Sequence, residues 1–329
     1  MKSGGARMLR NLFAKETRTI VIALVLLLLA LVIPNLKIPR STYTYIIFID
    51  ITQSMNVEDY ALNGAQVSRL DYARYSIRNA LRELPCGSRI GLGAFAEYRT
   101  LLLLAPIEVC ENYNDLLASL DHIDGRMRWI NSSEIAKGVF WSVRAAKEVG
   151  QGVNVMFLTD GQEAPPPRSS ALPNFEDVKS GQVHGWLIGV GGYAPQPIPK
   201  TDREGNRVGY WRAEDVIQRQ SESEGGTAGV SREHLSGLRE PHLQTIARRV
   251  GFEYAHLVTP STISEALRDP RFAQERPVPT DLYWLPAGAA LLILAFRFRP
   301  DLDALRKVRS WLRSFRSGRS DIPGSLDEL

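Results

Sequence analysis

Short apolar runs alternate along the middle of this chain with longer segments in which apolar residues recur every three or four positions. The runs predict buried strands, and the longer segments predict helices with one face against a core. The predicted strands are 43–50, 89–95, 100–105, 153–159, 182–190 and 252–257. The predicted helices are 67–84, 113–120, 133–149, 243–250 and 261–267. This alternation predicts an α/β fold with a doubly wound, mostly parallel sheet that helices cover on both faces.

One pair of predicted strands differs from the others because only the short turn 96–99 separates them. Such a connection predicts an antiparallel hairpin, and hence one antiparallel edge strand beside the parallel ones. Cys86 precedes the first of these strands and Cys110 follows the second, so the hairpin would bring the two cysteines together. We therefore predict a Cys86–Cys110 disulfide, which an oxidising environment permits. Two free buried thiols are the alternative.

Two further apolar segments flank the alternating region. Residues 19–36 give 18 positions around an unbroken apolar run, just enough for a helix to span a bilayer core of about 30 Å. Residues 282–296 form a shorter run of 15 positions. An aromatic pair stands just before Leu285 and arginines follow the run, as is typical of the two ends of a membrane span. We predict two transmembrane helices. A cleavable signal peptide is the alternative for the first segment, and a buried helix for the second.

The charge distribution agrees with two membrane spans. The formal charge is +4 and the pI is about 9.1, but residues 41–281 hold 25 basic and 30 acidic side chains. The excess of basic residues lies near the two apolar segments. Residues 1–40 hold 7 basic and 1 acidic side chain, and residues 297–329 hold 8 basic and 5 acidic side chains. By the positive-inside rule this predicts that both termini are cytoplasmic and that the acidic domain lies on the other side of the membrane. Binding to nucleic acid is not expected.

These observations divide the chain into five predicted regions. Residues 1–18 form a basic cytoplasmic N-terminus, 19–36 and 282–296 the two spans, and 41–280 the domain outside the membrane. Residues 297–329 have apolar residues at helical spacing between arginines, which predicts a basic amphipathic cytoplasmic tail resting on the membrane. A helix that docks a cytoplasmic partner is the alternative for this tail.

Oxygen-bearing side chains follow two of the predicted strands. Asp50 ends the first strand and is followed by Thr52 and Ser54, whereas Asp160 follows the strand 153–159. In a parallel sheet such residues meet at the carboxyl ends of the strands, where ligands bind. Carboxylate and hydroxyl oxygens suit a hard divalent cation such as Mg²⁺. A strand that ends in an ordinary polar turn is the alternative for the first loop.

This pattern resembles the metal-ion-dependent adhesion site of the von Willebrand factor A (VWA) domain family, which combines an Asp-x-Ser-x-Ser loop, a distant Thr and a further Asp. Asp50, Thr52 and Ser54 match the loop with Thr for the middle Ser, and Asp160 matches the last Asp. The segment after Asn131 resembles the Thr-containing segment and places Ser133 at that position, with Ser132 as its neighbour. The resemblance, over roughly residues 43–270, implies a Rossmann-like fold and bound Mg²⁺, Ca²⁺ or Mn²⁺.

Catalysis is not expected from these residues. The chain has no Walker loop, and the five histidines share no metal-ligand spacing. Without a base, neither Ser54 nor Ser133 is a credible nucleophile. The family resemblance implies binding instead, in which an Asp or Glu of a partner protein completes the coordination of the metal.

A long irregular segment, 191–240, leaves the carboxyl end of a predicted strand and is longer than an ordinary connection. It should therefore lie at the carboxyl ends of the strands, where the predicted metal residues also lie. We expect Tyr210 and Trp211 to form part of a partner-binding rim. An inert surface insertion is the alternative.

The architecture and three segments narrow the resemblance further. Two spans with one outward-facing domain resemble aerotolerance-operon VWA proteins, and residues 50–60, 209–211 and 234–240 resemble the VWA accessory proteins of methanol dehydrogenase. This implies a protein of the bacterial inner membrane whose VWA domain, residues 41–280, is periplasmic. It also implies that the membrane-tethered module aids maturation or assembly of a periplasmic partner, such as a quinoprotein dehydrogenase. Other VWA membrane proteins and a cytoplasmic AAA+ ATPase are further expected partners. A structural or stress-tolerance scaffold with a merely stabilising metal is the alternative.

Overall fold

The computed structural model describes most of the chain and divides it into two units. One unit comprises Ile38–Val278, and the other comprises Met1–Lys37 with Pro279–Leu329. The described residues are 15–34, 36–166, 173, 177–217 and 232–299. Most of the predicted cytoplasmic N-terminus and nearly all of the predicted amphipathic tail lie outside these ranges.

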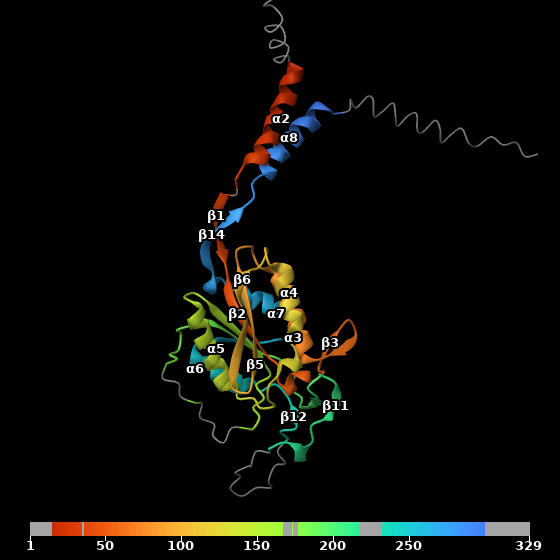
Figure 1. The fold of residues 1–329 in the computed structure, drawn as a ribbon. Helices are drawn as coiled ribbons and strands as arrows, with labels where there is room; N and C mark the ends of the chain where they lie inside the picture. The colour runs from red at the N-terminus through yellow and green to blue at the C-terminus, as the bar shows by residue number, and fades with distance from the viewer. Residues whose placement is uncertain (1–14, 35, 167–172, 174–176, 218–231, 300–329) are drawn as a thin grey trace, which may run out of the picture. The chain divides into compact units, whose positions relative to one another are not determined.

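The larger unit is built on a six-stranded sheet in the order β13-β8-β7-β2-β5-β6 (Figure 1). Its strands are β2 (Thr44–Asp50), β5 (Arg89–Ala96), β6 (Arg99–Glu108), β7 (Asn154–Thr159), β8 (Gly185–Gly189) and β13 (Glu253–His256). Neighbouring strands run parallel except at the edge, where β6 pairs antiparallel with β5. The predicted mixed, mostly parallel α/β sheet with one antiparallel edge strand is confirmed.

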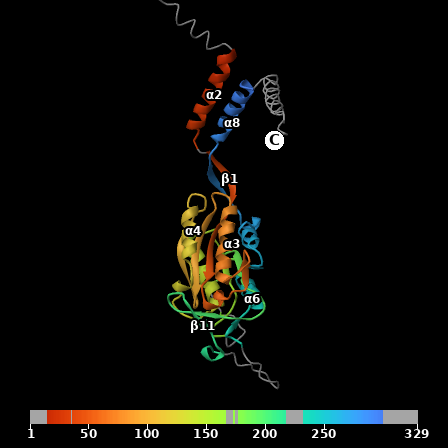
Figure 2. The same cartoon turned by 90° about the vertical axis from the view of Figure 1, so that its right-hand side faces the viewer.

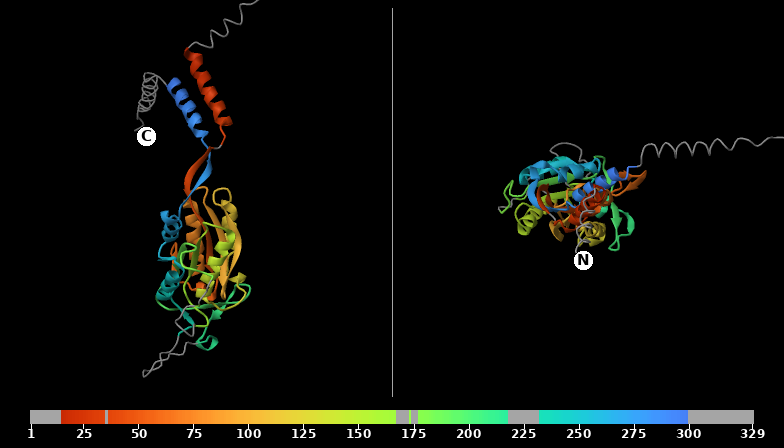
Figure 3. Two further views of the ribbon diagram at one scale, coloured as in Figure 1. Left: turned by 90° about the vertical axis from the view of Figure 1, so that its left-hand side faces the viewer. Right: turned by 90° about the horizontal axis from the view of Figure 1, so that it is seen from above.

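Helices cover both faces of this sheet because its central strands are apolar on both sides. All seven residues of β2 are buried; Ile47 and Ile49 pack into the core on one face, and Ile46 and Phe48 into the core on the other. The first face carries α3 (Arg69–Glu83), α4 (Tyr113–His122) and α7 (Ser261–Leu267). The second carries α5 (Ile135–Val149) and α6 (Glu240–Val250). Figure 2 shows α3 and α4 on one side, and Figure 3 shows the unit from the opposite side.

Local sequence signals set the ends of several helices. The hydroxyl of Ser68 accepts a hydrogen bond from the backbone N–H of Asp71 and caps α3. Gly251, in the left-handed conformation, ends α6. Helix α5 begins two residues later than predicted, because the backbone of Ser133 bridges to Glu97 and Ala164 instead.

Shorter elements surround the sheet. Within the insertion 191–240, β10 pairs with β11 and β9 pairs with β12. Outside it, β3 pairs with β4 around the turn Asn63-Gly64, and β1 pairs with β14. The bounds are β1 (Leu36–Thr42), β3 (Tyr60–Leu62), β4 (Ala65–Val67), β9 (Gln196–Pro197), β10 (Pro199–Thr201), β11 (Arg207–Tyr210), β12 (Leu235–Ser236) and β14 (Gln274–Thr280). The 3₁₀ helices are η1 (Gln53–Asn56), η2 (Gly125–Met127), η3 (Ala213–Asp215) and η4 (Pro270–Phe272).

The β5–β6 hairpin brings the two cysteines together, as predicted. The pairing of Arg89 with Glu108 continues the hairpin to its open end, next to both cysteines. Cys86 and Cys110 form a disulfide with a Cα–Cα distance of 5.3 Å. The alternative of two free thiols does not hold in this structure.

The smaller unit contains α2 (Lys15–Val32) and α8 (Trp284–Arg297), which pack side by side with Ala23 and Ala290 buried (Figures 1 and 2). Among the described residues, no helix combines the length and the apolarity that a membrane crossing requires. Helix α2 has 18 residues, but Lys15, Glu16 and Arg18 occupy its first turn. Helix α8 has 14 residues, which at 1.5 Å per residue is about 21 Å, short of a bilayer core. The prediction of spans at 19–36 and 282–296, and with it the inner-membrane localisation, is wrong.

Candidate metal-binding site

Two aspartates meet at the point where the strand order of the sheet reverses. Strand β2 ends at Asp50, and Asp160 follows β7 directly. The two strands are parallel neighbours, and the chain continues from β2 to β5 on one side and reaches β7 on the other. Their carboxyl ends therefore form the crevice in which doubly wound sheets bind ligands. Both aspartates are fully buried.

Asp50 is held by hydroxyl and backbone donors on both of its oxygens. Its Oδ1 accepts from the backbone N–H of Thr52 at 2.9 Å and from Thr52 Oγ1 at 2.7 Å. Its Oδ2 accepts from Thr159 Oγ1 at 2.6 Å. Thr159 was not among the predicted site residues, although it stands in the same Thr-Asp-Gly run as Asp160.

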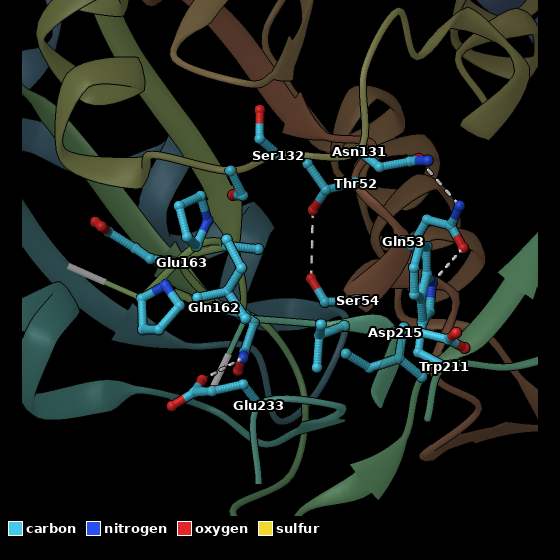
Figure 4. Close-up of a pocket in the computed structure, with 17 residues that line it drawn as sticks. Thr52, Gln53, Ser54, Asn131, Ser132, Gln162, Glu163, Trp211, Asp215 and Glu233 are labelled. Atoms are coloured by element: carbon cyan, nitrogen blue, oxygen red, sulfur yellow. Dashed lines mark hydrogen bonds between the residues drawn. The ribbon is translucent and has the colours of Figure 1, made fainter. Parts of the chain in front are cut away.

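Three residues with hydroxyl side chains, Thr52, Ser54 and Ser133, line one pocket, and Thr52 also contacts this carboxylate. Thr52 Oγ1 and Ser54 Oγ lie 3.3 Å apart and face each other (Figure 4). Ser133 is 3% exposed, and its Oγ has no hydrogen-bond partner among the described residues. Its backbone is fixed, because its N–H donates to Ala164 O at 2.7 Å and its carbonyl accepts from Ala164 N at 2.9 Å. The neighbouring Ser132 is partly exposed and lines the same pocket.

Asp160 has a different set of partners. Its Oδ1 accepts from the backbone N–H of Gln162 at 3.0 Å. Its Oδ2 accepts from Arg69 Nη1 and from Ser236 Oγ, both at 2.7 Å. The following residue, Gly161, has a φ of 79°, which turns the chain sharply after the aspartate.

Arg69 brings a third carboxylate into the cluster. Its guanidinium is fully buried and also bonds Asp59 through Nε and Nη2, the latter at 2.7 Å. Burial disfavours the charged guanidinium, but Asp160 and Asp59 more than offset this effect and raise the pKa of Arg69. One guanidinium stands against three carboxylates, Asp50, Asp59 and Asp160, so the cluster has an excess of two formal negative charges when all three are ionised. The sequence did not predict a role for Arg69, because a polar residue in the first turn of a helix is usually exposed to solvent.

Asp50 has no ion-pair partner among the residues that the structure describes, whereas Asp160 is paired with Arg69. Burial, and next the nearby charge of Asp160, raise the pKa of Asp50 to about 7, although hydrogen bonds from Thr159 and Thr52 oppose the rise. The Ser133 hydroxyl is also an unused buried oxygen. Two carboxylates and three neutral hydroxyls, in a cluster with an excess of negative charge, fit a hard divalent cation. The assignment of Asp50, Thr52, Ser54, Ser133 and Asp160 to a metal remains a prediction.

A pocket of about 230 Å³ opens above the hydroxyls (Figure 4). Thr52, Ser54 and Ser133 line one part of it, and residues from 162–166 and from the insertion 191–240 line the rest. Trp211, predicted as a rim residue, is among these lining residues. Tyr210 is not; its side chain is 48% exposed and stacks with Arg207.

No protein-family model and no curated protein match the chain. Among solved structures, an aerotolerance-related membrane protein from Bacteroides fragilis is 20% identical, with a TM-score of 0.46, over 68% of this chain and 96% of that one.

Two further solved structures are more distant. The ArnB paralog VWA2 from Sulfolobus acidocaldarius is 13% identical with a TM-score of 0.36, over 70% of this chain and 45% of that one. A von Willebrand factor type A protein from Catenulispora acidiphila is 13% identical with a TM-score of 0.38, over 70% and 42%. At TM-scores below 0.5 these likenesses establish neither a family nor a function for this chain.

Proposed function

We propose that this chain is a VWA-type binding module that holds a divalent cation and engages a partner protein through it. Asp50, Thr52, Ser54, Ser133 and Asp160 would hold the ion, with Mg²⁺ the first candidate and Ca²⁺ or Mn²⁺ the others. The observation that carries the proposal is the unpartnered buried hydroxyl of Ser133, which faces the same pocket as Thr52 and Ser54. A buried hydroxyl without a partner costs stability, and a cation would give it one.

The chemistry favours association over catalysis. When bound, the cation would act as a positive centre that attracts a carboxylate from outside. The hydroxyls of Thr52 and Ser54 contact each other, and Thr52 also contacts Asp50, which suits them to coordination. An Asp or Glu of the partner would reach the cation through the open pocket and supply a further ligand oxygen. Binding would therefore depend on both the cation and that acidic side chain.

The biological role that we propose is assembly or maturation of the partner. This part rests on the sequence resemblance to the accessory proteins of methanol dehydrogenase, for which a quinoprotein dehydrogenase is the natural partner. Other VWA proteins and an AAA+ ATPase would then be components of the same assembly.

One observation favours a second candidate, a structural scaffold in which the metal is only stabilising. Arg69 already compensates Asp160 at 2.7 Å, so part of the charge in the site is balanced by the protein itself. In that case the cation would stabilise the folded chain and would not take part in binding a partner protein.

Metal binding is tested first by calorimetric titration of the full chain with Mg²⁺ and Mn²⁺. Ser133→Ala should weaken binding by about tenfold or more, because it removes a ligand oxygen. Ser132→Ala is the matched control; it changes the adjacent, partly exposed serine and should bind like the unmodified protein. Equal affinity in both variants and in the parent would remove Ser133 from the site.

Partner capture then separates the two candidates. The unmodified chain and Asp50→Asn are each used to capture proteins with Mg²⁺ or with EDTA, followed by mass spectrometry. A protein retained only by the unmodified chain with Mg²⁺ supports the binding module. The same proteins in all four samples would favour the scaffold.

A further inference from the structure

The pocket above Thr52 and Ser54 has a wall that coordination of a metal does not require. Ile198, Trp211, Val216 and Ile217, all from the insertion 191–240, give this wall an apolar surface. A cation and a carboxylate need oxygen and nitrogen partners, so the wall is suited to another part of the molecule that enters the pocket.

Trp211 is fixed relative to the metal residues by Gln53. The indole Nε1 donates to Gln53 Oε1 at 2.8 Å, and Gln53 stands between Thr52 and Ser54 in the chain (Figure 4). The same Oε1 accepts from Thr201 N at 3.1 Å, and Nε2 donates to Asn131 Oδ1 at 3.1 Å. Gln53 is 7% exposed. The apolar wall therefore lies at a set distance from the hydroxyls that would hold the cation.

The acidic side chains of the pocket have partners nearby. Glu163 Oε1 lies 2.9 Å from His242 Nε2, and Glu233 Oε2 lies 3.4 Å from Arg239 Nη2. Asp215 Oδ2 is 3.8 Å from Lys200 Nζ. Because these carboxylates already pair with groups of the protein, they attract a basic side chain of a partner only weakly. The apolar residues of the wall suit an apolar side chain better.

The size of the pocket exceeds what a coordinated carboxylate needs. Its volume is about 230 Å³. An apolar protein cavity of about 150 Å³ is enough to hold a benzene molecule. A carboxylate at the hydroxyl end leaves room for a large apolar side chain against the wall.

We propose that the pocket receives an acidic residue and an adjacent large apolar side chain from one segment of the partner protein, and that Trp211 determines the apolar preference. The proposal rests on the proposed function, because the acidic residue reaches the site through the cation. Trp211 supplies a rigid aromatic surface of the kind that dominates protein interfaces. The partner is thus defined by chemistry as a protein segment with an acid next to Leu, Ile, Met or an aromatic residue.

The test is selection of a displayed random-peptide library that carries a fixed central Asp on the full-length protein with Mg²⁺. We expect enrichment of large apolar residues next to the Asp, and none in the presence of EDTA. Trp211→Ala should lose the apolar enrichment and weaken binding of a selected peptide by about tenfold or more. Ile217→Asp is the second variant; this side chain is 68% exposed, so the change places a charge on the wall with little effect on folding. Tyr210→Ala is the matched control, because it removes the neighbouring exposed aromatic that does not line the pocket.

The outcomes distinguish the two proposals. Loss of apolar enrichment in Trp211→Ala and Ile217→Asp, with Tyr210→Ala unchanged, supports the inference. Metal-dependent Asp peptides without an apolar preference, or a preference that survives both wall variants, would overturn the inference while the proposed function stands. Absence of any metal-dependent Asp peptide on the unmodified protein would count against the proposed function and the inference together.

Discussion

The guanidinium of Arg69 donates from Nη1 to Oδ2 of Asp160 at 2.7 Å, and both side chains are fully buried. Through the same nitrogen Arg69 also donates to Ser236 Oγ at 2.7 Å, and Asp59 accepts from Gly192 N at 2.9 Å. One cation thus ties the start of α3 to the end of β7, and its cluster reaches both ends of the insertion 191–240. This arrangement joins the candidate metal site to the walls of the pocket.

Removal of this guanidinium should be strongly destabilising. Arg69→Met leaves Asp160 and Asp59 buried without their cation, and breaking a buried ion pair costs about 3–5 kcal/mol. Urea unfolding measures the loss. Arg78→Met is the matched control, since Arg78 on the same helix forms an exposed pair with Asp121 that is worth about 0–1 kcal/mol. A similar loss of stability in both variants would show that the buried ion pairs of Arg69 contribute no more than the exposed pair of Arg78.

The stability of the metal-free protein should decrease with rising pH because of Asp50. The pKa of Asp50 is raised from 3.8 to about 7 in the folded state, so the folded protein keeps a proton that the unfolded chain releases. The contribution is present below pH 4, is lost between pH 4 and pH 7, and is on the order of 4 kcal/mol. Between pH 5 and pH 8 about 3 kcal/mol of this contribution should be lost, which urea unfolding in EDTA at the two pH values measures. Asp50→Asn is the control, because it keeps every other carboxylate and therefore shows the pH dependence that they cause. A parent and variant with the same pH dependence would contradict the prediction.

Metal affinity should follow the same ionisation in the opposite sense. The cation competes with the proton on Asp50, whose pKa is about 7, so Mg²⁺ binding should weaken by about tenfold for each pH unit below 7. Calorimetric titrations at several pH values give the slope, and buffers of different ionisation enthalpy give the number of protons released. Ser133→Ala should bind more weakly with an unchanged slope. Affinity that is constant from pH 6 to pH 8 would mean that Asp50 is already ionised or is not a ligand.

Gly161 should not tolerate a side chain. Its φ is 79°, and an added Cβ would lie 2.9 Å from Leu243 Cγ. Gly161→Ala therefore combines backbone strain of about 1–2 kcal/mol with a clash, and it should also weaken Mg²⁺ binding because Asp160 is adjacent. Gly64→Ala is matched in φ, at 82°, but an added Cβ there meets nothing within 4 Å. Equal thermal unfolding temperatures for the two variants would argue that the clash is relieved by movement of Leu243.

Reduction of the disulfide should lower stability without altering metal binding. The bond joins residues 24 positions apart, and a loop of that length corresponds to about 3 kcal/mol in chain-entropy models. Unfolding of Cys86→Ser/Cys110→Ser measures the loss, and titration with Mg²⁺ checks the site. Weakened Mg²⁺ binding in this variant would reveal a coupling between the hairpin and the site.

The order of the elements could be predicted because each strand and helix shows its own periodicity. The continuous apolar run that became β2 is buried on both faces, and the helical spacing after Leu70 became α3. The β3–β4 hairpin was missed although Asn63-Gly64 is a strong turn signal, because its strands have only three residues each. The membrane spans were wrong because apolar content alone does not fix the length of a helix or where its charged turn begins.

The sequence by itself determined the sheet, the disulfide-forming hairpin and the group of candidate metal oxygens, since strand ends and short loops are local features. Only the tertiary structure decided which side chains complete the site. Arg69 and Asp160 are 91 positions apart, and Gln53 and Trp211 are 158 apart. No periodicity relates residues at such separations, because a buried ion pair or a fixed indole arises only when distant segments pack together and exclude water.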